Sequence, residues 1–210
     1  AIVQARAHPG GGYAFAVASD YIVAAAKHAR RVIVEVNEDA PLAPGPHRIP
    51  DEKIVAVVPT KRPVLQMPPA RCGDVEQRMA RFVSDFIEDG ATLQVGIGAA
   101  AEAVMALVKD RRDLGIHSGM IGDSVAELTE AGVITNARKP IDTGRTVTGM
   151  LAGTDRLYRF ADGNEKLLML STDYTHDAAV LAQLPNLVSI NGAVEVDLTG
   201  QVNAEAAGGL

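Results

Sequence analysis

The stretch Gly115–Asp123, which reads GIHSGMIGD, concentrates residue types that nucleophilic catalysis uses. His117 and Ser118 could serve as the base and the nucleophile of an esterase. However, a nucleophile elbow needs the pattern Gly-x-Ser-x-Gly, and Ser118 stands in Ile-His-Ser-Gly-Met. Adjacent residues on a strand also point to opposite faces, so a serine seldom meets the histidine beside it. The pattern therefore favours a turn with polar framework residues, in which Asp123 caps the next helix.

A second candidate is the segment Gly96-Ile97-Gly98, which follows an expected strand and opens an alanine-rich helix. Glycines let the backbone approach a ligand, and a helix N-terminus offers free N–H groups to an anion. The third glycine of a dinucleotide fingerprint is absent, because Ala101 stands in its place, and no Gly-Lys-Ser/Thr of a P-loop follows. The segment is either a loop that cradles a ligand or a plain tight turn.

Two further candidates lie toward the C-terminus. His176 stands at an expected helix start, where it is either a site residue or a surface histidine near a cap. Glu195 and Asp197 share one face of an expected strand, where paired carboxylates either do acid–base work or face solvent. The five histidines and Cys72 show no metal-ligand spacing, so no metal site is expected.

These candidates need elements that position them, and the chain alternates between strand and helix patterns. Repeated β–α units of this kind predict an α/β fold with open, mostly parallel sheets and flanking helices. The expected strands are 31–36, 54–58, 91–95, 114–117, 146–151, 167–170, 187–190 and 194–198, and the expected helices are 20–29, 74–89, 99–109, 123–131, 154–161 and 175–184.

In such sheets, ligands bind beyond the carboxyl ends of the strands. Three connections follow expected strands at that edge: Gly96–Gly98, the turn after His117, and the turn at Asn191 and Gly192. We therefore expect the three connections to share one site.

Composition excludes several classes of function. The net charge is −6 and no basic run is present, whereas nucleic-acid binding depends on Lys and Arg that neutralise phosphates. No apolar run approaches the roughly 20 residues that span a bilayer, so no membrane partner is expected. The single cysteine, Cys72, rules out an intrachain disulfide and is typical of a reducing cytoplasm.

An ordered set of motifs resembles the acetyl-CoA hydrolase/transferase family (family I CoA-transferases), which includes 4-hydroxybutyrate CoA-transferases. The resemblance covers essentially the whole chain. It is carried by Gln94–Ala99 (QVGIGA), Leu114–Ser118 (LGIHS), Gly132–Asn136 (GVITN) and Ser189–Val202 (SINGAVEVDLTGQV).

The resemblance implies two related open α/β halves, a fold class shared with sugar-phosphate isomerases. On this basis, residues 1–60 are the end of the first half, the proline-containing segment 61–73 is a linker, and residues 74–210 are much of the second half. The chain lacks an initiator methionine and stops abruptly after Leu210, so we expect an excerpt of a longer polypeptide.

The resemblance also implies a chemistry. A family glutamate attacks the acyl-CoA carbonyl, forms an acyl anhydride and then a glutamyl-CoA thioester, and a second carboxylic acid takes the CoA. Coenzyme A is thus a substrate rather than a tightly bound cofactor, the partners are an acyl-CoA and a small carboxylic acid, and we expect a homo-oligomer. Candidate CoA-binding residues are Val95, Gly96, Ile97, Gly98, Asn191 and Gly192.

The sequence departs from the family pattern at the nucleophile. Where relatives read His-Ser-Glu, this chain has Gly119, and His176 aligns with a position often filled by Asn. Without that carboxylate three routes stay open: Glu195 is recruited, His176 or His117 activates water, or segments outside this chain supply the nucleophile. We expect altered transfer or hydrolysis; the alternatives are a non-catalytic CoA-binding or assembly subunit and, on the same fold, a sugar-phosphate isomerase.

Overall fold

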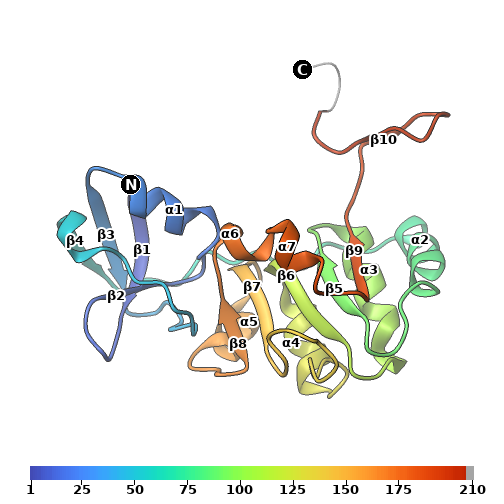
Figure 1. Cartoon of the computed structure of the whole chain (residues 1–210), viewed down its shortest axis with the longest axis horizontal. Coiled ribbons are helices and arrows are strands. Elements are labelled where there is room, and N and C mark those ends of the chain that lie inside the picture. Colours follow the sequence, from blue (N-terminus) through green and yellow to red (C-terminus); the bar gives the residue numbers. More distant parts are fainter. Residues whose placement is uncertain (207–210) are drawn as a thin grey trace.

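The computed structural model of the chain describes residues 1–206, which form two sheets side by side (Figure 1). The first sheet has the order β2-β1-β3-β4, in which β1, β3 and β4 are parallel and β2 is an antiparallel edge. Helix α1 covers the apolar face of this sheet. Its elements are β1 (Ile2–Ala7), β2 (Tyr13–Phe15), α1 (Tyr21–His28), β3 (Val32–Asn37), a 3-10 turn (Asp51–Lys53) and β4 (Ile54–Thr60).

The second sheet is entirely parallel and has the order β8-β7-β6-β5-β9. Its strands are β5 (Thr92–Val95), β6 (Gly115–Ile121), β7 (Thr146–Leu151), β8 (Leu167–Met169) and β9 (Leu187–Ile190). Its helices are α2 (Asp74–Ser84), α3 (Ala99–Leu107, followed by a 3-10 turn, Val108–Asp110), α4 (Asp123–Glu130), α5 (Asp155–Ala161), α6 (Thr172–Thr175) and α7 (Ala178–Leu181). The expected α/β fold with mostly parallel sheets is confirmed.

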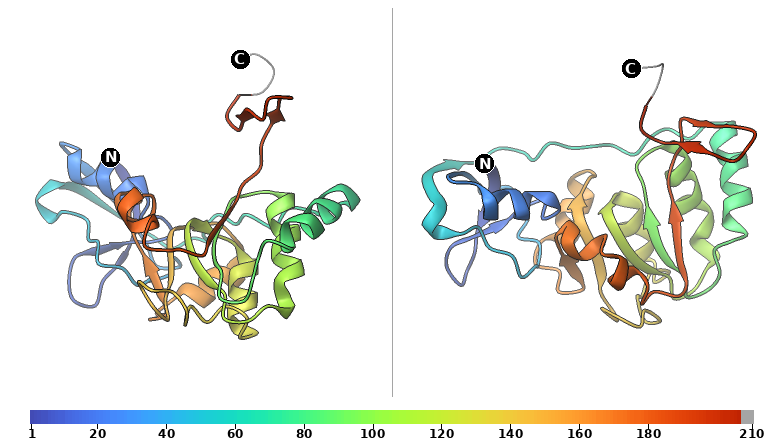
Figure 2. Two further views of the ribbon diagram at one scale, coloured as in Figure 1. Left: turned by 45° about the vertical axis from the view of Figure 1, so that its right-hand side comes forward. Right: turned by 45° about the horizontal axis from the view of Figure 1, so that its top comes forward.

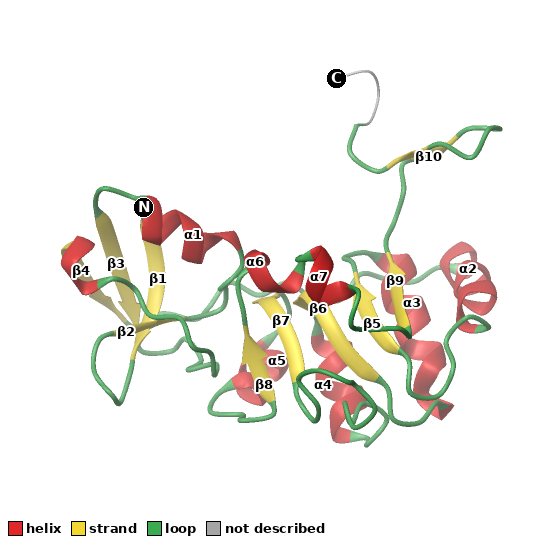
Figure 3. Ribbon diagram, viewed as in Figure 1, coloured by secondary structure: helices red, strands yellow, loops and turns green. Residues whose placement is uncertain are grey.

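The core of the second sheet forms because its central strands are covered on both faces, which favours nearly continuous burial. Leu93 of β5 and Ile116 of β6 are fully buried there, as is Leu157 of α5. Helices α4 and α5 lie behind the sheet, whereas α6 and α7 lie along its upper edge (Figure 3). Small residues of α3, such as Ala101 and Ala103, let that helix pack closely within the same core.

Several contacts join the sheets, among them a hydrogen bond from Met169 N of β8 to Pro44 O (2.8 Å). Residues 17–19 pair with the end of β7, through hydrogen bonds from Ser19 N to Gly149 O (2.7 Å) and from Leu151 N to Val17 O (2.8 Å). The segment 61–73 runs from β4 to α2 without a helix or strand, and Tyr158 Oη of α5 donates to Leu65 O (2.6 Å). The start of α1 therefore lies beside the carboxyl end of β7.

The chain beyond β9 leaves the body of the protein. A short antiparallel hairpin, β10 (Glu195–Val196) and β11 (Val202–Asn203), stands apart from both sheets in each view of Figure 2. Its apolar side chains, among them Val196 and Leu198, are exposed. The expected strand 194–198 is thus reduced to two paired residues.

Three expected boundaries are wrong for local physical reasons. The strand expected to end at His117 continues to Ile121, because pairing with β7 runs on through Met120 and Ile121. The helix expected over 175–184 splits into α6 and α7, because the Asp177 carboxylate accepts from Ala179 N and Val180 N and so begins a new helix. The helix expected over 74–89 ends at Ser84, where the next residues form turns instead.

The expectation that Asp123 caps its own helix is also wrong. Gly122 is the N-cap of α4, and the buried Asp123 carboxylate instead accepts from Thr154 N (3.0 Å) and Leu157 N (3.2 Å) at the start of α5. Parallel neighbours β6 and β7 end at one edge, so the residue after β6 lies beside the helix that follows β7. Gly153 permits the approach, because a Cβ there would lie 2.6 Å from Asp123 Oδ1.

No helix within residues 1–206 is long and apolar enough to cross a membrane.

We predict that Asp123→Ala lowers the free energy of unfolding by about 1–3 kcal/mol, because it leaves buried N–H groups of α5 without an acceptor. Urea denaturation followed by circular dichroism measures the change. The matched control is Asp85→Ala, at an exposed position just after α2, which should shift the free energy by less than about 0.5 kcal/mol. Equal effects of the two substitutions would contradict this role of Asp123.

Candidate functional site

A cavity of about 430 Å³ lies at the carboxyl ends of β5, β6 and β7, where the start of α1, α6 and the segment after β9 complete its wall. Six of the residues that the sequence singled out line this cavity: Val95, Gly96, Ile97, Gly119, His176 and Asn191. The three connections expected to share a site therefore do meet. Their assignment to ligand binding stays a prediction.

Gly96 is the point of closest approach between the glycine segment and β9. Its N–H donates to Ile190 O (2.8 Å), and a Cβ on Gly96 would lie 2.7 Å from Asn191 Oδ1. Asn191 in turn exchanges two hydrogen bonds with Gln94, from Asn191 Nδ2 to Gln94 Oε1 (2.8 Å) and from Gln94 Nε2 to Asn191 Oδ1 (3.1 Å). Gln94 also lines the cavity, and the sequence analysis did not propose it as a site residue.

Gly98 has φ +124°, a backbone conformation that side chains disfavour, and it is the N-cap of α3. The first turn of a helix has N–H groups without intrahelical acceptors, and they carry positive potential. Ile97, just before this cap, is 62% exposed and borders the cavity. The start of α3 can therefore stabilise negative charge at the cavity edge. Gly98 and Gly192 flank the cavity without lining it.

Ser118 is a framework residue of the sheet. Its hydroxyl donates to Val95 O (3.2 Å) and accepts from Val95 N (3.1 Å), so the hydroxyl is occupied on both sides. Regular pairing of β5 with β6 stops at Leu93 and Ile116, and Ser118 bridges the strands beyond that point. The interpretation of Ser118 as a framework residue agrees with this geometry, although it lies in a strand and not in a turn.

His117 is fully buried beneath α6 and does not border the cavity. Its Nε2 lies 3.2 Å from Thr175 O and donates to it, while Nδ1 is buried without a partner. Burial lowers the pKa of His117, and the nearby positive charge of Lys139 lowers it further. The expected activation of water by His117 has no support in this arrangement, in which the neutral imidazole supports α6.

The ring of His176 packs directly against the backbone of Gly119 at the cavity wall. A Cβ on Gly119 would lie 2.7 Å from His176 Cε1 and 3.1 Å from its Nε2, so the imidazole stands where a side chain at position 119 would begin. His176 Nδ1 lies 2.9 Å from Thr175 Oγ1, and this contact holds the ring in place. The backbone of α6 ends at His176, which leaves the ring exposed at the cavity wall.

Glu195 does not reach the cavity. It lies on the exposed hairpin that stands away from the sheets (Figures 1 and 2), where its Oε2 accepts from Asn203 Nδ2 at 3.4 Å. The expected recruitment of Glu195 has no support in this arrangement.

Glu102 is a carboxylate near the site that the sequence analysis missed. It belongs to the first turn of α3, and a small cavity of about 30 Å³ separates it from the glycine segment. Burial raises the pKa of Glu102, and the neighbouring carboxylates Asp123 and Glu127 raise it further, against a hydrogen bond with Ser124. Only its position in the first turn of a helix after a strand could have indicated it from sequence.

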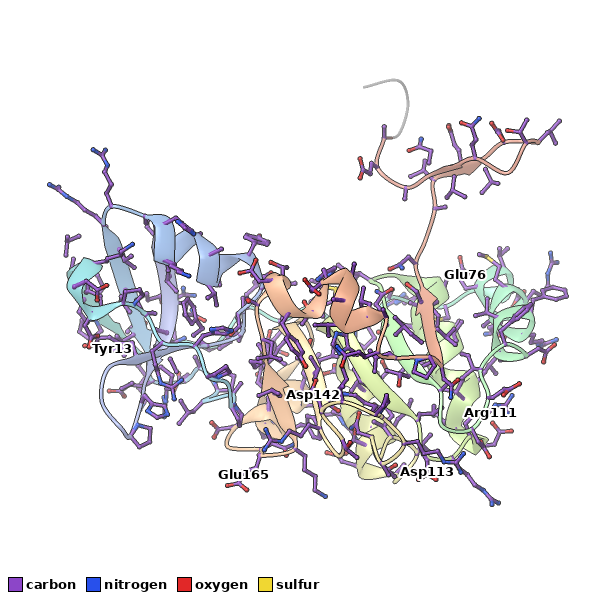
Figure 4. The ribbon with its side chains drawn as sticks, viewed as in Figure 1. Tyr13, Glu76, Arg111, Asp113, Asp142 and Glu165 are labelled. Carbon is purple, nitrogen blue, oxygen red and sulfur yellow. The ribbon has the colours of Figure 1, made fainter. Side chains whose placement is uncertain are left out.

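Two further cavities lie away from the glycine segment. One of about 720 Å³ is bordered by Asp142, Arg145 and Glu165, and one of about 400 Å³ lies between Arg6, Asp39 and Asp162. Figure 4 shows Glu165 and Asp113, which precede β8 and β6, along the lower edge of the second sheet, opposite α6 and α7. Within residues 1–206, no group of three or more His, Cys, Asp and Glu side chains is placed to hold a metal ion.

Comparison with known proteins identifies a family. Residues 153–210 match the acetyl-CoA hydrolase/transferase C-terminal domain. Nearly the whole chain, 99% of it, aligns with the 4-hydroxybutyrate coenzyme A transferase of Clostridium kluyveri at 42% identity over 209 residues. The chain belongs to the acetyl-CoA hydrolase/transferase family. The family resemblance expected from the sequence motifs is thereby confirmed.

Another relative and two solved structures are also similar to this chain. A Fasciola hepatica succinyl-CoA:acetate/propanoyl-CoA:succinate CoA transferase is 33% identical over 190 residues, which are 90% of this chain and 40% of the relative. The crystal structure of a 4-hydroxybutyrate CoA-transferase from Porphyromonas gingivalis superposes with a TM-score of 0.90 at 32% identity, over 96% of this chain and 52% of that one. RipA from Yersinia pestis gives a TM-score of 0.90 at 33% identity, over 97% of this chain and 48% of RipA.

The chain spans about half the length of the curated relatives that it matches, 49% in the case of the Clostridium kluyveri enzyme.

Lys139 supports the strand that carries Gly119. Its buried Nζ donates to Ile116 O (2.9 Å) and Arg145 O (2.8 Å), and the side chain crosses β6 over Gly115, where a Cβ would lie 2.7 Å from Lys139 Cγ. Burial lowers the pKa of Lys139 to about 8, against the opposing charge of Asp142. Charged Lys139 is therefore a cost to stability at neutral pH, partly offset by its two carbonyl partners.

We predict a stability profile that rises with pH because of Lys139. Between its folded pKa of about 8 and its unfolded value of 10.5, the unfolded state binds more protons, so the free energy of unfolding increases with pH. From pH 8 to pH 9.5 the increase is about 1–2 kcal/mol. Lys139→Met has no titrating group at this position and should remove the rise, as measured by urea titrations at several pH values.

The titration of Tyr174 does not affect the comparison between the natural chain and Lys139→Met. Burial and the hydrogen bond to Asp142 raise the pKa of Tyr174 to about 12, which lowers stability only above the ordinary tyrosine pKa and equally in both proteins. If the free energy of unfolding depends on pH in the same way in the natural chain and in Lys139→Met, the rise does not come from Lys139.

Proposed function

We propose that the cavity at the carboxyl ends of β5 and β6 binds the thioester group of an acyl-CoA. The protein then moves CoA from the acyl-CoA to a small carboxylic acid or to water. The observation that carries this proposal is the meeting, around one cavity, of the glycine segment that opens α3 with Gly119 and His176. Coenzyme A enters as a substrate, and the proposal includes no tightly bound cofactor.

The start of α3 suits the chemistry of acyl transfer. Attack on a thioester carbonyl puts negative charge on its oxygen, and fixed N–H donors aimed at that oxygen give the largest stabilisation in such reactions. The segment Gly96–Gly98 brings unhindered backbone to the cavity edge, with the positive end of a helix behind it. The relatives are named CoA transferases, which supports the same substrate class.

Gly119 limits the mechanism. The family resemblance places the glutamate nucleophile at position 119, and glycine can form neither an acyl anhydride nor a glutamyl-CoA thioester. Within residues 1–206 no carboxylate replaces it opposite His176, because Glu195 lies on the hairpin and Asp20 Oδ1 caps α1 through Ile22 N (3.2 Å). This same glycine favours the second candidate function, a CoA-binding subunit without catalysis.

Acyl-CoA binding can be tested by placing a negative charge at the mouth of the cavity. We expect Ile97→Glu, at an exposed residue that lines it, to weaken acetyl-CoA binding by about tenfold or more, since the new charge repels the anionic ligand. The control is Leu107→Glu at the other end of α3, which is 42% exposed. Isothermal titration of the complete natural polypeptide measures both, and equal affinities for the two variants would contradict this location.

We predict that the effect of a glutamate at position 119 on CoA transfer depends on the residue at position 176. Gly119→Glu alone should give little CoA transfer, because its Cβ would lie 2.7 Å from His176 Cε1 and the ring must move. The double variant Gly119→Glu/His176→Asn removes that conflict and should transfer CoA from acetyl-CoA to propionate at a rate at least tenfold above the single variant.

Mass spectrometry after borohydride treatment should then find an adduct on the introduced carboxylate of the double variant only. His176→Asn alone is the control, and it should show neither transfer nor adduct. Equal transfer by the single and double variants would show that the imidazole does not restrict position 119.

A further inference from the structure

We infer that His176 is a general base that delivers water to the bound thioester, so that this cavity hydrolyses acyl-CoA without a covalent enzyme intermediate. The inference rests on the proposed acyl-CoA binding and selects one reaction from the two that the proposed function allows. It assigns a catalytic role to an imidazole from the orientation of its ring, the absence of a side chain at position 119, and the groups around the cavity.

The contacts of Thr175 are those of a His176 ring with a free Nε2. The Thr175 hydroxyl oxygen lies 3.3 Å from Ser171 O and 2.9 Å from His176 Nδ1. We assign the single hydroxyl hydrogen to Ser171 O, so that the hydroxyl oxygen accepts from Nδ1. In this tautomer Nδ1 carries the proton, and Nε2 keeps the lone pair that a base requires.

Thr175 is itself held firmly. It is 3% exposed, and its carbonyl oxygen accepts from Nε2 of the buried His117 at 3.2 Å. His117 thus holds Thr175 in place, and Thr175 in turn orients the ring of His176. Precise placement of a base by a second group is a common requirement of nucleophile activation.

The glycine at position 119 makes room for the imidazole of His176 at the cavity wall. A Cβ on Gly119 would lie 2.7 Å from Cε1 and 3.1 Å from Nε2, so the ring fills the space where a side chain would begin. His176 is exposed and lines the cavity together with Gly96 and Ile97. A water molecule in the cavity can therefore approach the ring and donate to Nε2.

The other titratable side chains that line the cavity are poorly suited to the task. Asp20 is engaged as the N-cap of α1, and Tyr21 is 70% exposed at the start of that helix. His117 lies on the same strand as Gly119 but is buried, and it uses Nε2 as a donor. Among the residues that line the cavity, His176 combines a free lone pair with a direct path to solvent.

The reaction balances without another reagent. Nε2 of His176 removes a proton from water while the water oxygen attacks the thioester carbonyl carbon, and the negative charge on the carbonyl oxygen faces the start of α3. The carbon–sulfur bond then breaks, and the imidazolium returns its proton to the departing thiolate. One acyl-CoA and one water give one carboxylic acid and one free CoA thiol.

The test uses the complete natural polypeptide with acetyl-CoA and butyryl-CoA as probes, in water enriched in oxygen-18. We expect thiol release with one heavy oxygen in the product acid and no adduct after borohydride treatment. His176→Ala should lower kcat by about 100-fold or more while probe affinity stays within about threefold, and added imidazole should restore part of the rate. His176 is exposed, so the substitution leaves the core intact.

Two further variants separate catalysis from structure. Thr175→Val removes the partner of Nδ1 and should lower kcat without changing probe affinity, whereas Thr175→Ser keeps the hydroxyl and should retain most of the rate. His28→Ala, at an exposed histidine in the last turn of α1, is the control and should not change the rate.

The possible failures are distinguishable. If neither probe binds, the proposed acyl-CoA function is wrong and the inference falls with it. If a probe binds but releases no thiol, or if His176→Ala retains the natural kcat, the binding site stands and the role of His176 is overturned. An adduct on a carboxylate with unlabelled product acid would establish covalent transfer instead.

Discussion

The hydroxyl of Ser118 holds β5 and β6 together where their backbone pairing ends, and the geometry of the candidate site depends on it. By bonding both the N–H and the carbonyl of Val95, this side chain takes the place of ladder hydrogen bonds. The two strands can therefore part without leaving buried polar groups unpaired, which would cost about 1–3 kcal/mol for each group. β5 turns into the glycine segment, while β6 continues beside β7 to Ile121. The cavity occupies the space that this separation creates.

The separation also explains why small residues gather at this edge of the sheet. Gly96 must pass Asn191, and Gly119 must pass His176, at distances that a Cβ would violate. Gly149 of β7 meets the same restriction, since its Cβ would lie 2.9 Å from Gly119 O. Gly96 and Gly119 therefore bring backbone rather than side-chain atoms to the cavity wall. Their N–H and C=O groups are present whatever side chains are substituted elsewhere.

The sequence predicted the features that depend on local pattern. The strands 146–151 and 187–190 match β7 and β9 in both boundaries, since each is an apolar run bounded by turn residues. The convergence of Gly96, Gly119, His176 and Asn191 followed from the rule that parallel strands end at one edge. Contacts between residues far apart in the chain could not be predicted from local pattern. Asp123 accepts hydrogen bonds from Thr154 N and Leu157 N, 31 and 34 residues later, and no residue near Asp123 indicates this contact.

Glu195 and His117 were misplaced for different reasons. The expectation for Glu195 relied on alternation along a strand, but pattern alone does not say whether a strand joins the main sheet or forms a separate hairpin. His117 was a candidate for activating water, yet the pairing of β6 with β7 continues beyond it and α6 covers the imidazole. In both cases the location of the residue depends on which strands pair, and local sequence pattern does not specify that.

The pairing of residues 17–19 with the end of β7 means that the cavity has walls from both sheets. Asp20 and Tyr21 reach it from a part of the chain with its own hydrophobic core, separate from that of the second sheet. Mutational drift in the first sheet can therefore reshape the mouth of the cavity while the glycine segment and His176 stay untouched. In evolutionary terms, selection on the shape of the cavity mouth and selection on the glycine segment act on different stretches of the gene.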